Sequence, residues 1–185
     1  MMSDIEIHEA IGKDEIKIEG VKDLHIGPSS IDLHLDNKAR ILSYSESGID
    51  IRDANLDDNF VENNDWNSIA IAPGGFYLLS TKEKITLADD IGAFVQGRSS
   101  IGRLGINIHC AGYCDVGFSG TITLEVSNFT SRTVILPVNT RICQLVFFRT
   151  GIPAQIPYGK KPGAKYQNQS GPTITKIGDE YAYES

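Results

Sequence analysis

Hydrophobic and polar residues alternate along several short stretches of this chain. In SIDLHLD (30–36), every second residue is isoleucine or leucine, and TITLEVSN (121–128) and RICQLVFF (141–148) behave in the same way. A period of two places alternate side chains on opposite faces of a β-strand. Three shorter apolar runs, each bounded by turn-forming residues, predict further strands: AIAIA (69–73), FYLLS (76–80) and AFVQG (93–97). Many short strands separated by turns predict an all-β sandwich or barrel.

Three segments depart from this alternation. Residues 3–11 predict a short helix, with Ser3 as its cap and Glu6 three positions later. Residues 43–66 are acidic and weakly patterned, which indicates an excursion on the surface. Residues 151–185 are rich in glycine, proline, lysine and glutamine and are too polar for a core strand. This last segment is therefore a candidate mobile tail.

Composition narrows the class of protein. With 185 residues, 41% hydrophobic and 22% charged, the chain suits one globular domain, with a β body over 1–150 and a tail over 151–185. It has no leader pattern and no apolar run of the ~18 residues of a membrane span, so we expect a cytoplasmic protein. Three cysteines without a CxxC motif favour a reducing compartment. A net charge of −7 argues against nucleic-acid binding, but a local cluster of cations can still hold a small anion.

The segment from residue 97 to residue 125 concentrates the candidate chemistry. Arg98 and Arg103 flank a pair of serines, Ser99 and Ser100. Guanidinium groups match phosphate oxygens in a bidentate way, so this cluster predicts a polyphosphate site. From these residues alone, a polar helix start with Ser99 as its cap is an equally good interpretation.

Two carboxylates follow, Asp115 in a loop and Glu125 in the strand over 121–128. The alternation points the Glu125 side chain away from the apolar set. Two acids placed in this way suit general acid–base chemistry on the group that the polyphosphate carries. Taken alone, a strand glutamate is more often a solvated side chain, and an Asp-x-Gly sequence is usually only a turn.

The order of these motifs closely resembles the dCTP deaminase branch of the dUTPase superfamily. Residues 26–42 resemble its first strand motif, residues 73–100 its middle segment, and residues 157–173 its nucleotide-covering tail, whereas residues 44–68 lack a clear counterpart. A match at three separated places is more specific than any single motif. The resemblance implies a jelly-roll-like, distorted β-barrel (β-clip) with short helices. It also implies a homotrimer with sites shared between neighbouring subunits.

The resemblance implies a role in deamination for four residues. Glu125 is the general base that takes a proton from the water attacking cytosine C4, and then delivers protons to N3 and the departing ammonia. Ser99 helps to hold that water, Arg103 stabilises hydroxide, and the carbonyl of Ala111 faces the amino group and the water. Plain dUTPases generally read RSGLA at the serine motif and lack this arginine, so Arg103 favours a deaminase.

Further residues that match the family imply a second step, attack of water on the α-phosphate. Asp115 would contact the deoxyribose 3′-hydroxyl and orient a water at the α-phosphate. Gly112 and Tyr113 match the Gly-aromatic pair of the bifunctional, dUMP-forming deaminases, and Gln144 matches a dUTPase-like glutamine. Together they favour conversion of dCTP and two waters to dUMP, ammonia and diphosphate, in pyrimidine deoxynucleotide biosynthesis. The alternatives are a deaminase that releases dUTP, a dUTPase alone and, more remotely, a catalytically silent nucleotide-binding regulator.

The tail supplies the remaining implied contacts, because Tyr158, Lys165 and Gln169 have the spacing that the family uses to close over the triphosphate. The full set of implied substrate contacts is Arg98, Ser99, Ser100, Ile101, Gly102, Arg103, Asp115, Thr123, Leu124, Glu125, Gln144, Tyr158, Lys165 and Gln169. A closing tail of this kind would exclude bulk water from the reaction.

The only metal ion that we expect is one bound to the nucleotide. The H-x-E and P-C-x-x-C motifs of zinc-dependent deaminases are missing, so we expect no zinc. Mg²⁺ is expected, held mainly by phosphates and water.

The chain reads His109-Cys110-Ala111 where the family usually has His-x-Thr-Ala, so we expect a reshaped loop. The family's inhibition by dTTP uses movement of this loop, which makes dTTP a candidate inhibitor that depends on the loop's shape.

Overall fold

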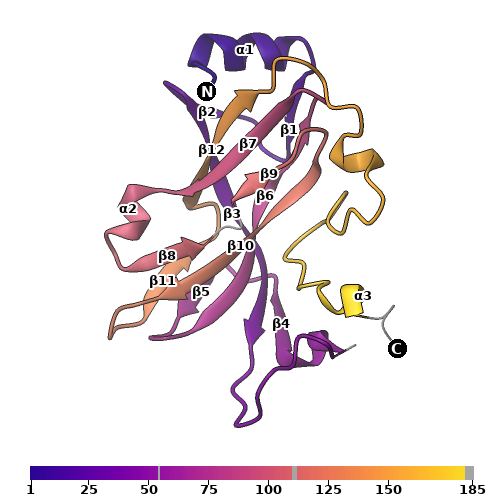
Figure 1. Cartoon of the computed structure of the whole chain (residues 1–185). Coiled ribbons are helices and arrows are strands. Elements are labelled where there is room, and N and C mark those ends of the chain that lie inside the picture. The colour runs from indigo at the N-terminus through magenta and orange to yellow at the C-terminus, as the bar shows by residue number, and fades with distance from the viewer. Residues whose placement is uncertain (54, 110–111, 182–185) are drawn as a thin grey trace.

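A computed structural model describes residues 1–53, 55–109 and 112–181 of the chain, and strands dominate this part (Figure 1). The strands are β1 (Ile16–Glu19), β2 (His25–Gly27), β3 (Ser30–Leu42), β4 (Phe60–Asn64), β5 (Ser68–Ile71), β6 (Phe76–Leu87), β7 (Ile91–Gly97), β8 (Ile106–His109), β9 (Tyr113–Cys114), β10 (Ser119–Asn128), β11 (Val134–Pro137) and β12 (Arg141–Arg149). The helices are α1 (Asp4–Gly12), η1 (Leu56–Asn59), α2 (Ser99–Gly102), η2 (Tyr158–Lys160) and α3 (Gly178–Tyr181). The predicted all-β class is confirmed.

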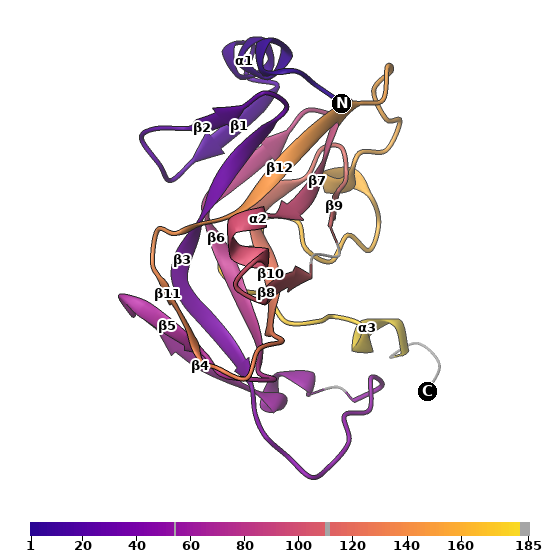
Figure 2. The same ribbon diagram turned by 90° about the vertical axis from the view of Figure 1, so that its left-hand side faces the viewer.

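The main sheet curls into a half-barrel. Its strand order is β8-β10-β6-β3-β12-β7-β9, with β1 added to β6, and with β2 and β4 added to β3. The strands β5 and β11 form a separate antiparallel pair. Figures 1 and 2 show α1 at one end of the half-barrel and β4 and β5 at the other, with the C-terminal tail running along one side.

The alternation read from the sequence separates the two faces of this sheet. Ile31 pairs with Leu145, and Leu145 pairs with Val95 on the next strand. This row points into the core, and each of its side chains is at most 4% exposed. The next residue on each strand faces the other way, because side chains alternate along a strand. That outer row, Asp32, Gln144 and Gln96, is polar.

The N-terminal helix has the predicted cap. Ser3 stands at the N-cap of α1, where its hydroxyl accepts a hydrogen bond from the Glu6 amide at 3.4 Å. The Glu6 carboxylate accepts a hydrogen bond from the Ser3 amide at 2.7 Å. This reciprocal capping box satisfies two amides that the helix itself leaves unpaired.

The acidic segment 43–66 lies on the surface as predicted, since its described residues apart from Leu56 are exposed or half-buried, but it also contains regular structure. Its second half contains η1 and β4, and β4 pairs with the end of β3, where Phe60 lies opposite Leu42. The β3 strand continues to Leu42, beyond the alternating stretch, and this extension provides the partner for β4.

The tail is bound to the β body by backbone hydrogen bonds. The Asn168 amide donates to the Ser119 carbonyl at 2.7 Å, and the Thr121 amide donates to the Gln169 carbonyl at 3.0 Å. The tail therefore lies along β10. No helix in the described ranges is long and apolar enough to span a membrane.

Candidate active site

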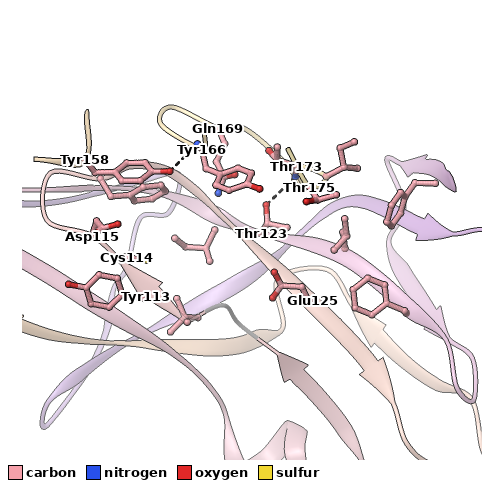
Figure 3. Close-up of a pocket in the computed structure, with 18 residues that line it drawn as sticks. Tyr113, Cys114, Asp115, Thr123, Glu125, Tyr158, Tyr166, Gln169, Thr173 and Thr175 are labelled. Atoms are coloured by element: carbon pink, nitrogen blue, oxygen red, sulfur yellow. Dashed lines mark hydrogen bonds between the residues drawn. The ribbon is translucent and has the colours of Figure 1, made fainter. Parts of the chain in front are cut away.

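A cavity of about 550 Å³ lies between the half-barrel and the tail (Figure 3). Glu125 and Thr123 enter it from β10, Asp115 from the turn after β9, and Tyr158 and Gln169 from the tail. Figure 3 shows Asp115 and Glu125 on opposite sides of the cavity, with tail residues above both. The structure thus brings both predicted acids into one cavity.

The position of Glu125 follows from the structure of β10. Glu125 pairs with Leu78 of β6 on one side and with His109 of β8 on the other, so its backbone is fixed from both sides. Its neighbours Leu124 and Val126 are completely buried on the opposite face. The predicted orientation of Glu125, away from the apolar set, is therefore confirmed.

An irregularity in β10 lies just before the two cavity residues. The register with β6 shifts between Thr121 and Thr123, and the Ile122 amide between them donates to the buried hydroxyl of Thr81 at 2.9 Å. A β-bulge bends its strand and changes the direction of the following side chains. The buried hydroxyl satisfies the amide that the shift leaves unpaired, which makes this bend stable.

The turn that carries Asp115 requires a glycine. Gly117 has φ 75°, and a Cβ atom there would lie 2.6 Å from Cβ of Pro157. The Tyr158 amide donates to the Val116 carbonyl at 2.9 Å. The Asp115 turn and the start of the tail are thus packed directly against each other, so the tail holds this acid in place.

Cys114 shows how apolar the surroundings of this acid are. Burial, together with the neighbouring charge of Asp115, raises the pKa of the Cys114 thiol to about 12. The thiol lines the cavity in its neutral form at physiological pH, and a neutral thiol is a poor nucleophile. The Cys114 thiol is therefore a weaker candidate for chemistry in this cavity than the two carboxylates.

The predicted tail residues occupy different positions. Tyr158 packs on Phe118, with ring centroids 5.9 Å apart. The amide nitrogen of Gln169 donates to the Thr121 carbonyl at 2.7 Å, and its oxygen is buried with no hydrogen-bond partner among the described residues. An unpaired buried acceptor in a cavity is available to a donor on a ligand. Lys165, in contrast, forms an ion pair with Glu180 at the surface.

Several cavity residues were not identified from the sequence. Phe60 comes from the acidic segment, Phe76 from the start of β6, and Tyr166, Thr173 and Thr175 from the tail. The Thr173 amide donates to the Thr123 hydroxyl at 3.1 Å, which closes the tail over β10 next to Glu125. The tail motif contains Tyr166 and Thr173, so the signal for these two was present, whereas nothing in the sequence indicated Phe60.

The serine–arginine motif lies outside the cavity. Ser99, Ser100 and Arg103 are exposed in and after α2, and none of them lines the cavity. In Figure 1, α2 and the tail lie on opposite sides of the half-barrel. A single chain therefore does not bring this motif to Glu125.

Other predicted contacts divide between the two faces of the sheet. Gln144 is half-buried on the outer polar row, on the face opposite the core. The side chains of Ile101 and Leu124 are buried in the core, so only their backbone groups can meet a ligand. Gly102 is exposed in α2. Gly112 and Tyr113 line the cavity, and Ala111 lies outside the described residues.

Possible metal ligands are not clustered in the part of the chain that the structure describes. No group of three or more His, Cys, Asp or Glu side chains there could hold a metal ion. A divalent cation in this cavity would need most of its ligands from a bound molecule and from water.

Comparison with solved structures defines the class of fold. The chain superposes with a TM-score of 0.62 on the 2′-deoxycytidine 5′-triphosphate deaminase from Agrobacterium tumefaciens, at 23% identity, covering 79% of this chain and 46% of that one. It superposes with a TM-score of 0.51 on the EIAV dUTPase, at 17% identity, covering 76% of this chain and 92% of that one. The chain therefore has the same fold as these two proteins.

Sequence comparison defines the family within that class. Residues 1–150 match the family model described as dCTP deaminase-like. The chain is 40% identical over 189 residues to the protein of Dictyoglomus turgidum named "dCTP deaminase, dUMP-forming", covering 98% of this chain and 96% of that protein. The chain belongs to the dCTP deaminase-like family.

Proposed function

We propose that the protein is a dCTP deaminase that forms dUMP, releasing ammonia and diphosphate. The observation that carries this proposal is the placement of Glu125 and Asp115 in one cavity that the tail covers. The name of the 40% identical Dictyoglomus turgidum relative supports the choice of substrate and product.

Deamination needs a base beside the reacting carbon, and Glu125 has the position for this role. In the proposed step, Glu125 takes a proton from a water whose oxygen bonds to C4 of cytosine. The carboxyl group delivers this proton to N3, then takes the remaining proton of the new C4 hydroxyl and delivers it to the amino nitrogen. The C4–N bond breaks, ammonia leaves, and the base becomes uracil. The apolar walls of the cavity, such as Phe76 and Leu78, would keep bulk water from competing for these protons.

Hydrolysis of the triphosphate is assigned to the other acid. In the proposed second step, Asp115 orients a water whose oxygen attacks the α-phosphorus and whose proton passes to the Asp115 carboxylate, and diphosphate leaves with the electrons of the broken P–O bond. The rigid turn that Gly117 and the tail provide would fix the direction of the Asp115 carboxylate. Gly112 and Tyr113, beside this acid in the cavity, are the residues expected to distinguish this product from dUTP.

A neighbouring subunit would complete the site. Ser99, Ser100 and Arg103 are exposed and do not line the cavity of their own chain, as expected if they serve the cavity of another chain in a homotrimer. Arg103 would then stabilise the attacking hydroxide, and Arg98 and Ser100 would contact phosphate. The mechanism requires no zinc, and Mg²⁺ would arrive with the triphosphate, held by phosphate oxygens and water.

A product time course tests this proposal. The protein is incubated with dCTP and Mg²⁺, and ammonia, dUTP, dUMP and diphosphate are followed separately. We expect equal amounts of ammonia, dUMP and diphosphate, with no accumulation of dUTP. Asp115→Asn should slow diphosphate release by about 100-fold or more, since the uncharged amide cannot take a proton from the oriented water. Deamination can fall as well, because the same side chain would hold the sugar.

Other outcomes would assign a different function. Accumulation of one dUTP per ammonia would indicate a deaminase that stops at dUTP. Hydrolysis of added dUTP without ammonia from dCTP would indicate a dUTPase alone. Tight binding of dCTP without any product would favour a silent nucleotide-binding regulator.

A further inference from the structure

One carboxylate joins two arginines on the outer face of the sheet. Asp32 lies on β3, Arg98 directly follows β7, and Arg141 begins β12, the strand between them. A single oxygen, Oδ2 of Asp32, lies 3.1 Å from Nε of Arg98 and 3.3 Å from Nη1 of Arg141. The pairing of β12 with both neighbouring strands brings these three residues together.

The guanidinium of Arg98 is fixed at two points. Its Nε faces Asp32, and its Nη1 donates a hydrogen bond to the Arg141 carbonyl at 3.1 Å. Two fixed contacts define the plane of a guanidinium group, so the orientation of Arg98 is set.

Exposure increases outward through the cluster. The side chains of Asp32, Arg98 and Arg141 are 15%, 23% and 43% exposed. The acid lies at the base, and the two cations lie above it, closer to solvent. One carboxylate between two guanidiniums leaves an excess of one positive charge, in a chain whose net charge is −7. An excess of positive charge on two adjacent guanidinium groups suits the binding of a phosphate group.

We propose that Asp32 is a positioning residue that holds Arg98 and Arg141 together as a two-arginine clamp for a nucleotide phosphate. Arg141 thereby becomes a second arginine contact, in addition to Arg98. This inference rests on the proposed function for the identity of the ligand, because the clamp itself recognises only phosphate.

Two effects of Asp32 oppose each other. Its charge repels a phosphate, whereas its oxygen orders both guanidiniums and screens their mutual repulsion. If orientation dominates, loss of the charge weakens phosphate binding, and if repulsion dominates, the same loss strengthens binding. The sign of the change in affinity therefore decides between the two.

The first experiment compares Asp32→Asn with a matched control in steady-state kinetics on dCTP. Asp90 pairs with Arg149 at 2.6 Å near the opposite end of β12, so Asp90→Asn removes a similar ion pair away from the clamp. We expect Asp32→Asn to raise KM about tenfold with kcat within about twofold, and Asp90→Asn to change neither. A fall in KM, or a fall in kcat at constant KM, would overturn the proposal.

The second experiment uses diphosphate alone as the probe, with calorimetry on the intact oligomer. Asp32→Asn and Arg141→Gln should each weaken diphosphate binding about tenfold and leave deoxycytidine binding unchanged. Arg52→Gln, an exposed arginine paired with Asp50, is the control for loss of one surface cation. Diphosphate affinity in Arg141→Gln equal to that of this control would overturn the proposal.

This second experiment separates the inference from the proposed function. If the wild-type protein fails to deaminate dCTP yet binds diphosphate through the clamp, the proposed function is wrong and the clamp stands. If Asp32→Asn does not fold, Arg141→Gln still decides, because Arg141 is the most exposed member of the cluster.

Discussion

The cavity under the tail and the outer face of β3, β12 and β7 hold opposite kinds of groups. The cavity holds two carboxylates among apolar and aromatic walls, and burial there raises a thiol pKa to about 12. The outer face holds two arginines on one aspartate, beside a polar row of side chains. The first region suits proton transfer, and the second suits binding of an anion.

On the proposed function, these two regions are the halves of one site, and one chain carries them on different sides of its sheet. A reaction that needs both halves requires two chains, each presenting a different half to the other.

Glu125→Gln should reduce ammonia release by about 1,000-fold or more, because the amide keeps the shape of the side chain and loses the base. Affinity for dCTP, measured by calorimetry, should stay within about threefold of wild type. Glu19→Gln, at an exposed position of strand β1, is the matched control and should have no effect. Deamination near the wild-type rate would remove Glu125 from the mechanism.

Substitutions of the two arginines of the serine motif should change different kinetic constants. Arg103→Ala should lower kcat by about 100-fold or more, since it would remove charge stabilisation of the attacking hydroxide. Arg98→Ala should mainly raise KM, by about tenfold, because it would remove a phosphate contact. Steady-state kinetics on dCTP measure both. Equal shifts of kcat and KM in the two variants would contradict their separate roles.

Mixing two inactive variants tests the division directly. Glu125→Gln disables the cavity, and Arg103→Ala disables the exposed motif. If each site takes its cavity from one subunit and its motif from a neighbour, random reassembly of equal amounts should restore about a quarter of the sites. The assay is ammonia release after co-refolding. Activity no higher than that of the separate variants would place both residues in the same subunit's site.

Glu180→Gln should have the smallest effect. The carboxylate of Glu180 pairs with Lys165 and raises the pKa of that lysine. A bound triphosphate would have to replace this carboxylate, so its loss should lower KM for dCTP by about threefold at most, because exposed ion pairs are weak. Asp179→Asn is the neighbouring control. A raised KM would show that Glu180 helps to position the lysine.

The sequence predicted the elements with clear periodicity. The alternating residues of 30–36 and 121–128 lie in β3 and β10, and the Ser3 cap begins α1. Phe60 could not be predicted as a cavity residue, because its place depends on the pairing of β4 with the extension of β3. That pairing joins segments whose own patterns are weak.

The sequence predicted the residues of the candidate site better than it predicted their arrangement in space. The motifs identified Glu125 and Asp115, and the fold brings both to one cavity. The separation of Arg103 from that cavity is a property of the curled sheet, which carries α2 and the tail on opposite sides. The role of Asp32 also needed the structure, since only strand order brings it to Arg98 and Arg141.

The attachment of the tail to β10 has a consequence for measurement. The Thr121 amide donates to the Gln169 carbonyl in the tail, whereas Leu124, three residues further along, pairs with Leu79 inside the sheet. Hydrogen–deuterium exchange at Thr121 therefore requires only departure of the tail, whereas exchange at Leu124 requires opening of the sheet. The ratio of these two exchange rates would report how often the tail opens. A bound nucleotide that holds the tail closed would slow the first rate and leave the second nearly unchanged.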